Sequence, residues 1–157
     1  MADGMVYQFK SGAYIPKGVT PEGIMEERDR IEHDYGKVTI ENSVEAVLAS
    51  PEKYPNLRAF GPADEAEAMR QGVADGIRRA YRVVVVRRVN PEGRSESRQI
   101  RVIHSIRDQD DEFTYKPLEV IRESPEDRKY LILQLQKDAD AYADKMRDVL
   151  AEIAETL

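Results

Sequence analysis

The sequence predicts an α+β fold: a helix-dominated single domain with one antiparallel β-hairpin, or three strands if the N-terminus adds one, and a long C-terminal helix. Two strand-like segments flank a turn between residues 77 and 107, and capped helical segments precede this hairpin. Helical periodicity extends from residue 124 to the end of the chain. We assign residues 1–157 to one domain, with its core at about 19–157 and an N-terminal arm of strand and loop at 1–18.

The hairpin at 77–107 is the clearest strand prediction in the chain. Its first strand, 81–89, is β-branched and aromatic apart from its arginines, which suits a pleated surface. Pro91 and Gly93 predict the turn, because proline presets φ and glycine accepts positive φ. The return strand, 99–107, alternates between apolar and polar residues. An isolated hairpin is marginal in water, so we expect helices, a third strand or a partner to cover it.

The N-terminal half predicts strand, loop and two helices. Residues 5–10 alternate weakly and would add a short strand to the hairpin. Thr20 has the position of an N-cap and Pro21 that of the first helical residue, and Gly36 would end this helix with positive φ. Thr39 would then open a second helix as its N-cap.

A proline-rich, irregular segment over 52–62 separates the second helix from a third. Three of its side chains are expected to anchor it in the core: Tyr54, Leu57 and Phe60. The third helix is predicted over 63–80, acidic in its first turn and basic in its last, which complements the helix dipole. Gly72 and Gly76 lie four residues apart on it and would allow close approach by another backbone.

After the hairpin, residues 108–112 predict an acidic loop and 115–122 a short helix. The longest helix follows, from 124 to about 156. Its apolar residues recur at a spacing near 3.5, which is typical of a bundle or coiled-coil face: Leu131, Leu135, Tyr142, Met146, Val149 and Ile153. This face would pack either on the chain's own hairpin or on a second copy, so homo-oligomerisation through it is one of two alternatives.

The composition indicates a cellular context. The chain has no cysteine, which excludes a disulfide framework and thiol chemistry and fits a reducing compartment. The first ten residues lack the apolar region of a signal peptide, and no apolar run approaches the length of a membrane span. We therefore expect a soluble cytoplasmic protein that does not contact a membrane.

The net charge of -6 is unevenly distributed. Residues 76–107 hold nine arginines and two glutamates, a local charge of +7, so the remainder of the chain carries -13. These arginines either pair with acids on neighbouring helices, as arginine readily does, or bind an acidic protein or nucleic acid. The candidate partner-binding residues are Arg79, Arg82, Arg87, Arg88, Arg94, Arg98 and Arg101.

No catalytic signature occurs in the sequence. His33 and His104 lack the local spacing of zinc ligands, and the acidic stretch 108–112 lacks the alternate ligands and central glycine of a calcium loop. Neither a phosphate-binding glycine loop nor a nucleophile elbow is present. We therefore expect a non-enzymatic protein with no catalytic residue, no metal and no cofactor. A hydrolase built from carboxylates that are distant in the sequence is the residual alternative.

Binding of nucleic acid through the hairpin at 77–107 is the alternative to binding of a protein. A basic β-ribbon can enter a major groove and would then contact phosphates, with strong salt dependence and little base readout. Aromatic side chains that could stack on single strands are missing there, apart from Tyr81 at its base. The acidic remainder of the chain and a pI near 5.1 favour a protein partner.

Three stretches carry a resemblance to a known family: GKVTIENSVEAV from Gly36, residues 63–86, and residues 115–157. Together with the order of the predicted elements, they resemble small, mostly uncharacterised accessory proteins encoded by tailed phages and prophages. The resemblance implies a phage-encoded protein that acts in the host cell cytoplasm. The family has no activity that can be transferred to this chain. Our own leading hypothesis is a host or phage protein as partner, and inhibition of a host defence is one role that fits the composition by analogy.

Overall fold

The computed structural model describes residues 5–62, 69–89, 92 and 95–155. The chain divides into two compact units, Met1–Glu119 and Val120–Leu157. The described elements confirm the predicted α+β class, because helices dominate, the strands pair antiparallel and a long helix lies at the C-terminus. None of the described helices combines the length and the apolar character needed to cross a membrane.

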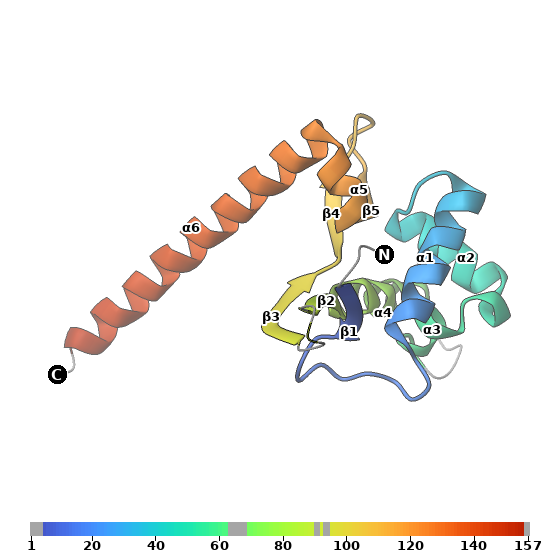
Figure 1. The fold of residues 1–157 in the computed structure, drawn as a ribbon, viewed down its shortest axis with the longest axis horizontal. Coiled ribbons are helices and arrows are strands. Elements are labelled where there is room, and N and C mark those ends of the chain that lie inside the picture. The colour runs from blue at the N-terminus through green and yellow to red at the C-terminus, as the bar shows by residue number, and fades with distance from the viewer. Residues whose placement is uncertain (1–4, 63–68, 90–91, 93–94, 156–157) are drawn as a thin grey trace. The chain divides into compact units, whose positions relative to one another are not determined.

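The first unit holds most of the elements (Figure 1). In chain order they are β1 (Met5–Phe9), α1 (Pro21–Tyr35), α2 (Ile40–Ala49), the 3-10 turn η1 (Pro51–Lys53), α3 (Pro55–Ala59), α4 (Met69–Val83), β2 (Val84–Val89), β3 (Ser95–Arg101), β4 (Ile103–Arg107) and β5 (Phe113–Pro117). Helix α5 (Leu118–Glu123) crosses the boundary between the units, and α6 (Pro125–Glu155) lies in the second unit.

Strand β2 is the centre of a three-stranded antiparallel sheet in the order β1-β2-β3. Val86 lies opposite Tyr7 of β1 and Ile100 of β3, which confirms the predicted N-terminal strand. Val84 and Val85 on neighbouring positions are buried as well as Val86, so both faces of β2 are covered. This explains why its sequence is a run of valines rather than an alternating pattern.

The predicted return strand over 99–107 is divided in the structure. Strand β3 ends at Arg101, and the chain then leaves the first sheet at Val102. The Val102 N–H still donates to the Val84 carbonyl at 3.1 Å, whereas its own carbonyl accepts from the Leu118 N–H at 2.7 Å. The segment that follows therefore turns towards a different partner strand.

That partner is β5, which forms a separate two-stranded antiparallel sheet with β4. Ile103 lies opposite Pro117, and Ile106 opposite the buried Thr114. The prediction of a short helix over 115–122 is wrong at its start. Residues 115–117 belong to β5, and the helix begins only at Leu118. The acidic loop at 108–112 is consequently the turn of a second hairpin.

Helices α1 and α2 begin at the capping residues that the sequence predicts, whereas α4 continues to Val83, so residues 81–83, which were predicted as strand, are helical. The Thr20 hydroxyl accepts from the Gly23 N–H at 3.0 Å, and the Thr39 hydroxyl accepts from the Asn42 N–H at 3.0 Å. Gly36 ends α1 with a φ of 82°, the conformation that glycine adopts without strain.

Helices α1 to α4 lie together beside the three-stranded sheet (Figure 1) and share one apolar core. The three predicted anchors of the proline-rich segment are all buried in it: Tyr54, Leu57 and Phe60. The segment also approaches α4 closely, as the two glycines predict. A Cβ atom at Gly76 would lie 2.5 Å from the Phe60 carbonyl oxygen, so only glycine fits there.

A buried carboxylate joins α1 to the start of α3. Glu27 is 3% exposed, and its two oxygens accept from the backbone N–H groups of Asn56 and Leu57, each at 3.0 Å. Burial raises the pKa of Glu27, and the hydrogen bonds from Leu57 and Asn56 oppose that rise. The carboxylate therefore satisfies donors that the five-residue helix α3 would leave unpaired.

Candidate binding surface

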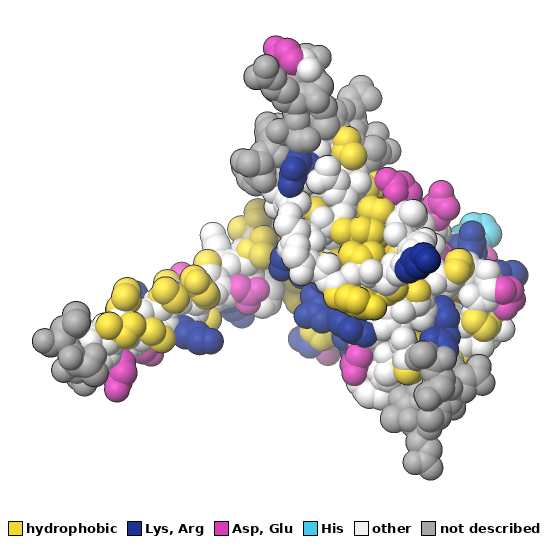
Figure 2. All heavy atoms as spheres, turned by 90° about the horizontal axis from the view of Figure 1, so that it is seen from below, with side chains coloured by type: hydrophobic (Ala, Val, Ile, Leu, Met, Phe, Trp, Pro, Cys, Tyr) yellow, Lys and Arg dark blue, Asp and Glu magenta, His cyan; other side chains and the backbone are white. Residues whose placement is uncertain are grey.

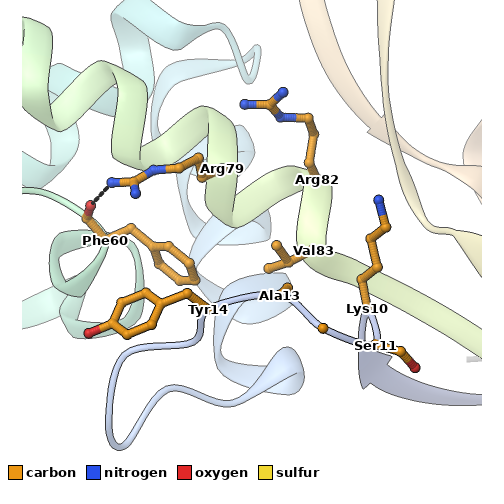
Figure 3. Close-up of a pocket in the computed structure, with 9 residues that line it drawn as sticks. Lys10, Ser11, Ala13, Tyr14, Phe60, Arg79, Arg82 and Val83 are labelled. Carbon is orange, nitrogen blue, oxygen red and sulfur yellow. Dashed lines mark hydrogen bonds between the residues drawn. The ribbon is translucent and has the colours of Figure 1, made fainter.

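A hollow of about 390 Å³ lies in the first unit, between the loop that follows β1 and the C-terminal half of α4. Figure 3 shows Lys10 at one end of it, Tyr14 and Phe60 at the other, and Arg79 and Arg82 along the helix. We call this hollow, with these five side chains, the basic cleft. It holds two of the candidate arginines and the predicted core anchor Phe60, together with Lys10 and Tyr14, which the sequence analysis did not single out.

Local structure brings these residues together. Arg79 and Arg82 are three positions apart, so they are neighbours on one face of α4. The Lys10 N–H donates to the Val83 carbonyl at 2.7 Å, which fixes the end of β1 beside the end of α4. The guanidinium of Arg79 donates to the Phe60 carbonyl at 2.6 Å and joins the helix to the proline-rich segment.

The three cations of the basic cleft have no carboxylate partner within the part of the chain that the structure describes. Arg79 bonds to a carbonyl, and Arg82 donates to the Arg78 carbonyl at 3.4 Å. Arg78, on the same helix, contrasts with them because it pairs with Asp75 at 3.2 Å. Among the described residues, ion pairs with helix acids therefore do not neutralise the positive charge of the cleft.

The other candidate arginines differ in exposure. Arg87 of β2 is half-buried, and its Nε is buried without a hydrogen-bond partner among the residues that the structure describes. Arg101 is also half-buried and donates to the Ile103 carbonyl at 2.9 Å. Burial lowers the pKa of Arg101, and the positive charge of Arg82 lowers it further. The two guanidinium groups therefore repel each other electrostatically. The remaining candidate side chains lie outside the described residues: Arg88, Arg94 and Arg98.

Tyr14 is the functional candidate that sequence reasoning missed. Its side chain is 82% exposed beside the cations of the cleft. The available clue was an aromatic residue in a loop of glycines and proline, with no apolar periodicity that would bury it. Tyr81, the aromatic residue that the sequence places at the base of the hairpin, is fully buried and hydrogen-bonds to the Ser43 hydroxyl at 2.9 Å.

The acidic loop converges on a lysine. The Nζ of Lys37 lies 2.8 Å from Asp108, 2.5 Å from Asp110 and 3.4 Å from Glu112. Hydrogen bonds to Asp108 and Asp110 raise the pKa of Lys37, and the hydrogen bond from Lys37 lowers the pKa of Asp108. The charge that a bound cation would supply is thus already supplied by Lys37. Among the described residues, no group of three or more His, Asp or Glu side chains is arranged to hold a metal ion.

Each histidine has a local partner. His33 is exposed on α1, with its Nδ1 2.9 Å from Asp34. His104 is half-buried on β4, and its Nε2 lies 2.9 Å from the Arg101 carbonyl, so this nitrogen carries the donated proton. Burial lowers the pKa of His104.

Two other hollows in the described part, of about 490 and 500 Å³, are lined by charges of both signs. In the first, Glu27 is held by the backbone of α3. In the second, Arg78 and Asp111 each have an ion-pair partner. The basic cleft differs from both because its charges are of one sign.

Helix α6 of the second unit carries the predicted oligomer face. Figure 2 shows hydrophobic side chains following one another along it. Leu131 is half-buried, and the other five predicted residues of that face are exposed by 41–65%: Leu135, Tyr142, Met146, Val149 and Ile153. Apolar exposure in a continuous stripe is typical of an interaction surface.

Comparison of the chain with protein-family models, with curated proteins and with solved structures found no match. The resemblance to phage accessory proteins therefore stays a prediction. The fold and the site define a small α+β protein with a basic surface that has aromatic residues at its edge.

Proposed function

We propose that this protein is a non-enzymatic binding protein that recognises an acidic segment of another protein at the basic cleft. The observation that carries the proposal is the cluster of Lys10, Arg79 and Arg82, which has no carboxylate partner within the described residues. Cations that are not neutralised inside the chain remain available for carboxylates of a partner.

The composition of the cleft supports a protein ligand. Arginine and tyrosine are enriched among the residues that dominate binding energy at protein interfaces, and here Arg79, Arg82 and the exposed Tyr14 line one hollow. The planar guanidinium can hold a carboxylate through two parallel hydrogen bonds. The net charge of -6 opposes long-range attraction of a polyanion such as DNA, and this favours a short acidic segment.

The order of elements that resembles phage accessory proteins supports a more specific form of the proposal. In that form, the partner is a host or phage protein met in the cytoplasm of an infected bacterium, and the outcome is inhibition of a host defence. Occupation of an acidic site on the partner would be the inhibitory event.

Single-stranded nucleic acid is a second candidate ligand for the same cleft. Tyr14 offers an exposed ring on which a base could stack, while Arg79 and Arg82 could contact phosphates. The sequence predicted such binding along the whole hairpin at 77–107. We place it at the cleft, where Arg79 and Arg82 of that segment lie near an exposed aromatic ring.

Fluorescence anisotropy with two labelled probes tests the proposal. One probe is a glutamate-rich peptide and the other a single-stranded oligonucleotide. Arg82→Ala removes a cleft cation, and we expect it to weaken peptide binding about tenfold, the effect of losing a charge-assisted hydrogen bond. Arg78→Ala is the matched control, since it removes an arginine of the same helix that pairs with Asp75 and does not line the cleft.

The outcomes separate the candidates. Peptide binding that Arg82→Ala weakens and Arg78→Ala does not supports the protein ligand. Binding of the oligonucleotide alone, weakened by Tyr14→Ala and steeply reduced by salt, supports nucleic acid instead. Equal effects of the two arginine substitutions on the peptide would show that the cleft is not its binding site.

A further inference from the structure

Helix α6 holds an uninterrupted heptad repeat of apolar positions. Starting from Ile132 and alternating steps of three and four residues, every position up to Ile153 is apolar. All seven side chains are exposed in the structure, and the six from Ile132 to Val149 form what we call the α6 seam: Ile132, Leu135, Ala139, Tyr142, Met146 and Val149. A repeat sustained over three heptads is typical of a coiled coil and leads to a left-handed supercoil with a partner helix.

We propose that the α6 seam binds the α6 seam of a second copy of this chain, antiparallel and in one register. In this register the smallest residue of each seam, Ala139, lies opposite the largest residue of the other, Tyr142. The full set of layers is Ile132 with Val149, Leu135 with Met146, Ala139 with Tyr142, and the same three pairs repeated by symmetry. The contact is the same on both copies, as a two-fold dimer requires.

Size complementarity favours this arrangement over a parallel one. In a parallel dimer in register, Tyr142 would face Tyr142 and Ala139 would face Ala139. One layer would then be overfilled and the next underfilled, and both conditions are unfavourable in a packed interface. The antiparallel register instead places each tyrosine over an alanine.

Charge complementarity selects the same register. Asp138 and Lys145 flank the seam on one side, and in an antiparallel pair the flanking positions of that side face each other. The proposed register places Asp138 opposite Lys145 of the second copy, twice per dimer. A slip by one heptad in one direction would face Asp138 with Asp138, and a slip in the other would face Lys145 with Lys145. A parallel dimer would place the uncharged Ala143 and Leu150 opposite these charges, so no ion pair would form there.

The first test is the oligomeric state of the full-length chain, measured by light scattering after size exclusion, together with a charge swap. We expect a dimer for the wild type. Asp138→Lys should weaken dimerisation at least tenfold, because it places two lysines opposite each other. Addition of Lys145→Asp should restore it, because the swapped charges again face opposite charges. A monomeric wild type, or a double variant no better than the single one, would overturn the proposal.

The second test measures whether the two α6 helices of the dimer are parallel or antiparallel. It does not require a variant that weakens the dimer. The chain has no cysteine, so Lys137→Cys and Ala151→Cys each provide one site for a spin label on the outer side of α6. At a rise of 1.5 Å per residue, the antiparallel register offsets the two labels along the axis by about 10 Å for position 137 and about 32 Å for position 151. Electron–electron distances that are equal at the two positions would show a parallel dimer and refute the antiparallel one.

Discussion

At the scale of single residues, one lysine organises the turn between β4 and β5. Asp108 contacts Lys37 and also accepts from the backbone N–H groups of Asp110 and Glu112, at 2.9 and 3.0 Å. Its carboxylate thus shapes the turn and holds the lysine of a distant segment. The ion pair is formed only in the folded chain and requires an ionised Asp108. Its contribution to the stability of the fold therefore depends on the protonation of Asp108.

We predict that Asp108→Asn lowers stability at neutral pH and that the difference from the wild type disappears in acid. The folded-state pKa of Asp108 lies below its ordinary value of 3.8, so its contribution is present above that value and is lost as the pH falls through the depressed one. Asparagine keeps an oxygen for the two backbone donors and removes only the charge. Urea midpoints across the acidic range measure the difference.

Lys37→Met provides the control for this prediction. In that background, Asp108→Asn should have a much smaller effect, because the partner of the charge is gone. A difference between wild type and Asp108→Asn that stays constant with pH would contradict the role given to the ion pair.

Residue-scale features differ in how far sequence predicts them. Caps such as Thr20 and Thr39 were predicted correctly, because a cap depends on donors two or three residues away. The convergence of three acids on Lys37 spans more than seventy residues, and no local pattern encodes it. The exposure of Tyr14 likewise depends on what the rest of the fold leaves uncovered.

At the scale of elements, the contact between α4 and the proline-rich segment shapes the basic cleft. Gly76 lies against the Phe60 backbone, and one turn later Arg79 donates to the Phe60 carbonyl. The absence of a side chain at Gly76 therefore allows the approach that the Arg79 hydrogen bond uses. Helix packing and the basic cleft share the same few atoms.

We predict that Gly76→Ala destabilises the protein by about 2 kcal/mol, because a clash with backbone atoms places the overpacking cost at the upper end of its range. Alanine favours the helical state by about 1 kcal/mol, but overpacking against a backbone costs about 1–3 kcal/mol, and the new Cβ would lie 2.5 Å from the Phe60 oxygen. Chemical denaturation measures the loss. Gln71→Ala, on the exposed side of α4, should change stability by less than about 0.5 kcal/mol. A Gly76→Ala variant as stable as the wild type would show that the segment can move away freely.

Elements with strong periodicity or clear ends were predicted from sequence, and α6 is the best example. The division of the return strand at Val102 was not predicted, because Ile100, Val102 and Ile106 continue one alternation across the break. Strand partners are chosen by contacts far along the chain, here with β2 before the break and with β5 after it. A sequence pattern records which face is buried but not which strand lies next to it.

At the scale of the whole molecule, the two proposals have a joint consequence. A dimer held by the α6 seam would carry two copies of the basic cleft. Binding of the second cleft to a surface that presents several acidic segments is then intramolecular, and its effective concentration is high. Affinity for such a surface would exceed that of a single cleft without any new contact.

We predict that disruption of the dimer weakens binding to a densely presented ligand and leaves binding to a single ligand unchanged. Asp138→Lys alters α6 and no residue of the basic cleft, so its affinity for the acidic peptide in solution should equal that of the wild type. On a sensor surface coated densely with the same peptide, the variant should dissociate at least about tenfold faster, and addition of Lys145→Asp should restore slow release. If the charge swap restores the dimer but release stays fast, the two clefts cannot engage one surface together. Weaker binding of the single variant to the peptide in solution would instead show that α6 itself contributes to the ligand site.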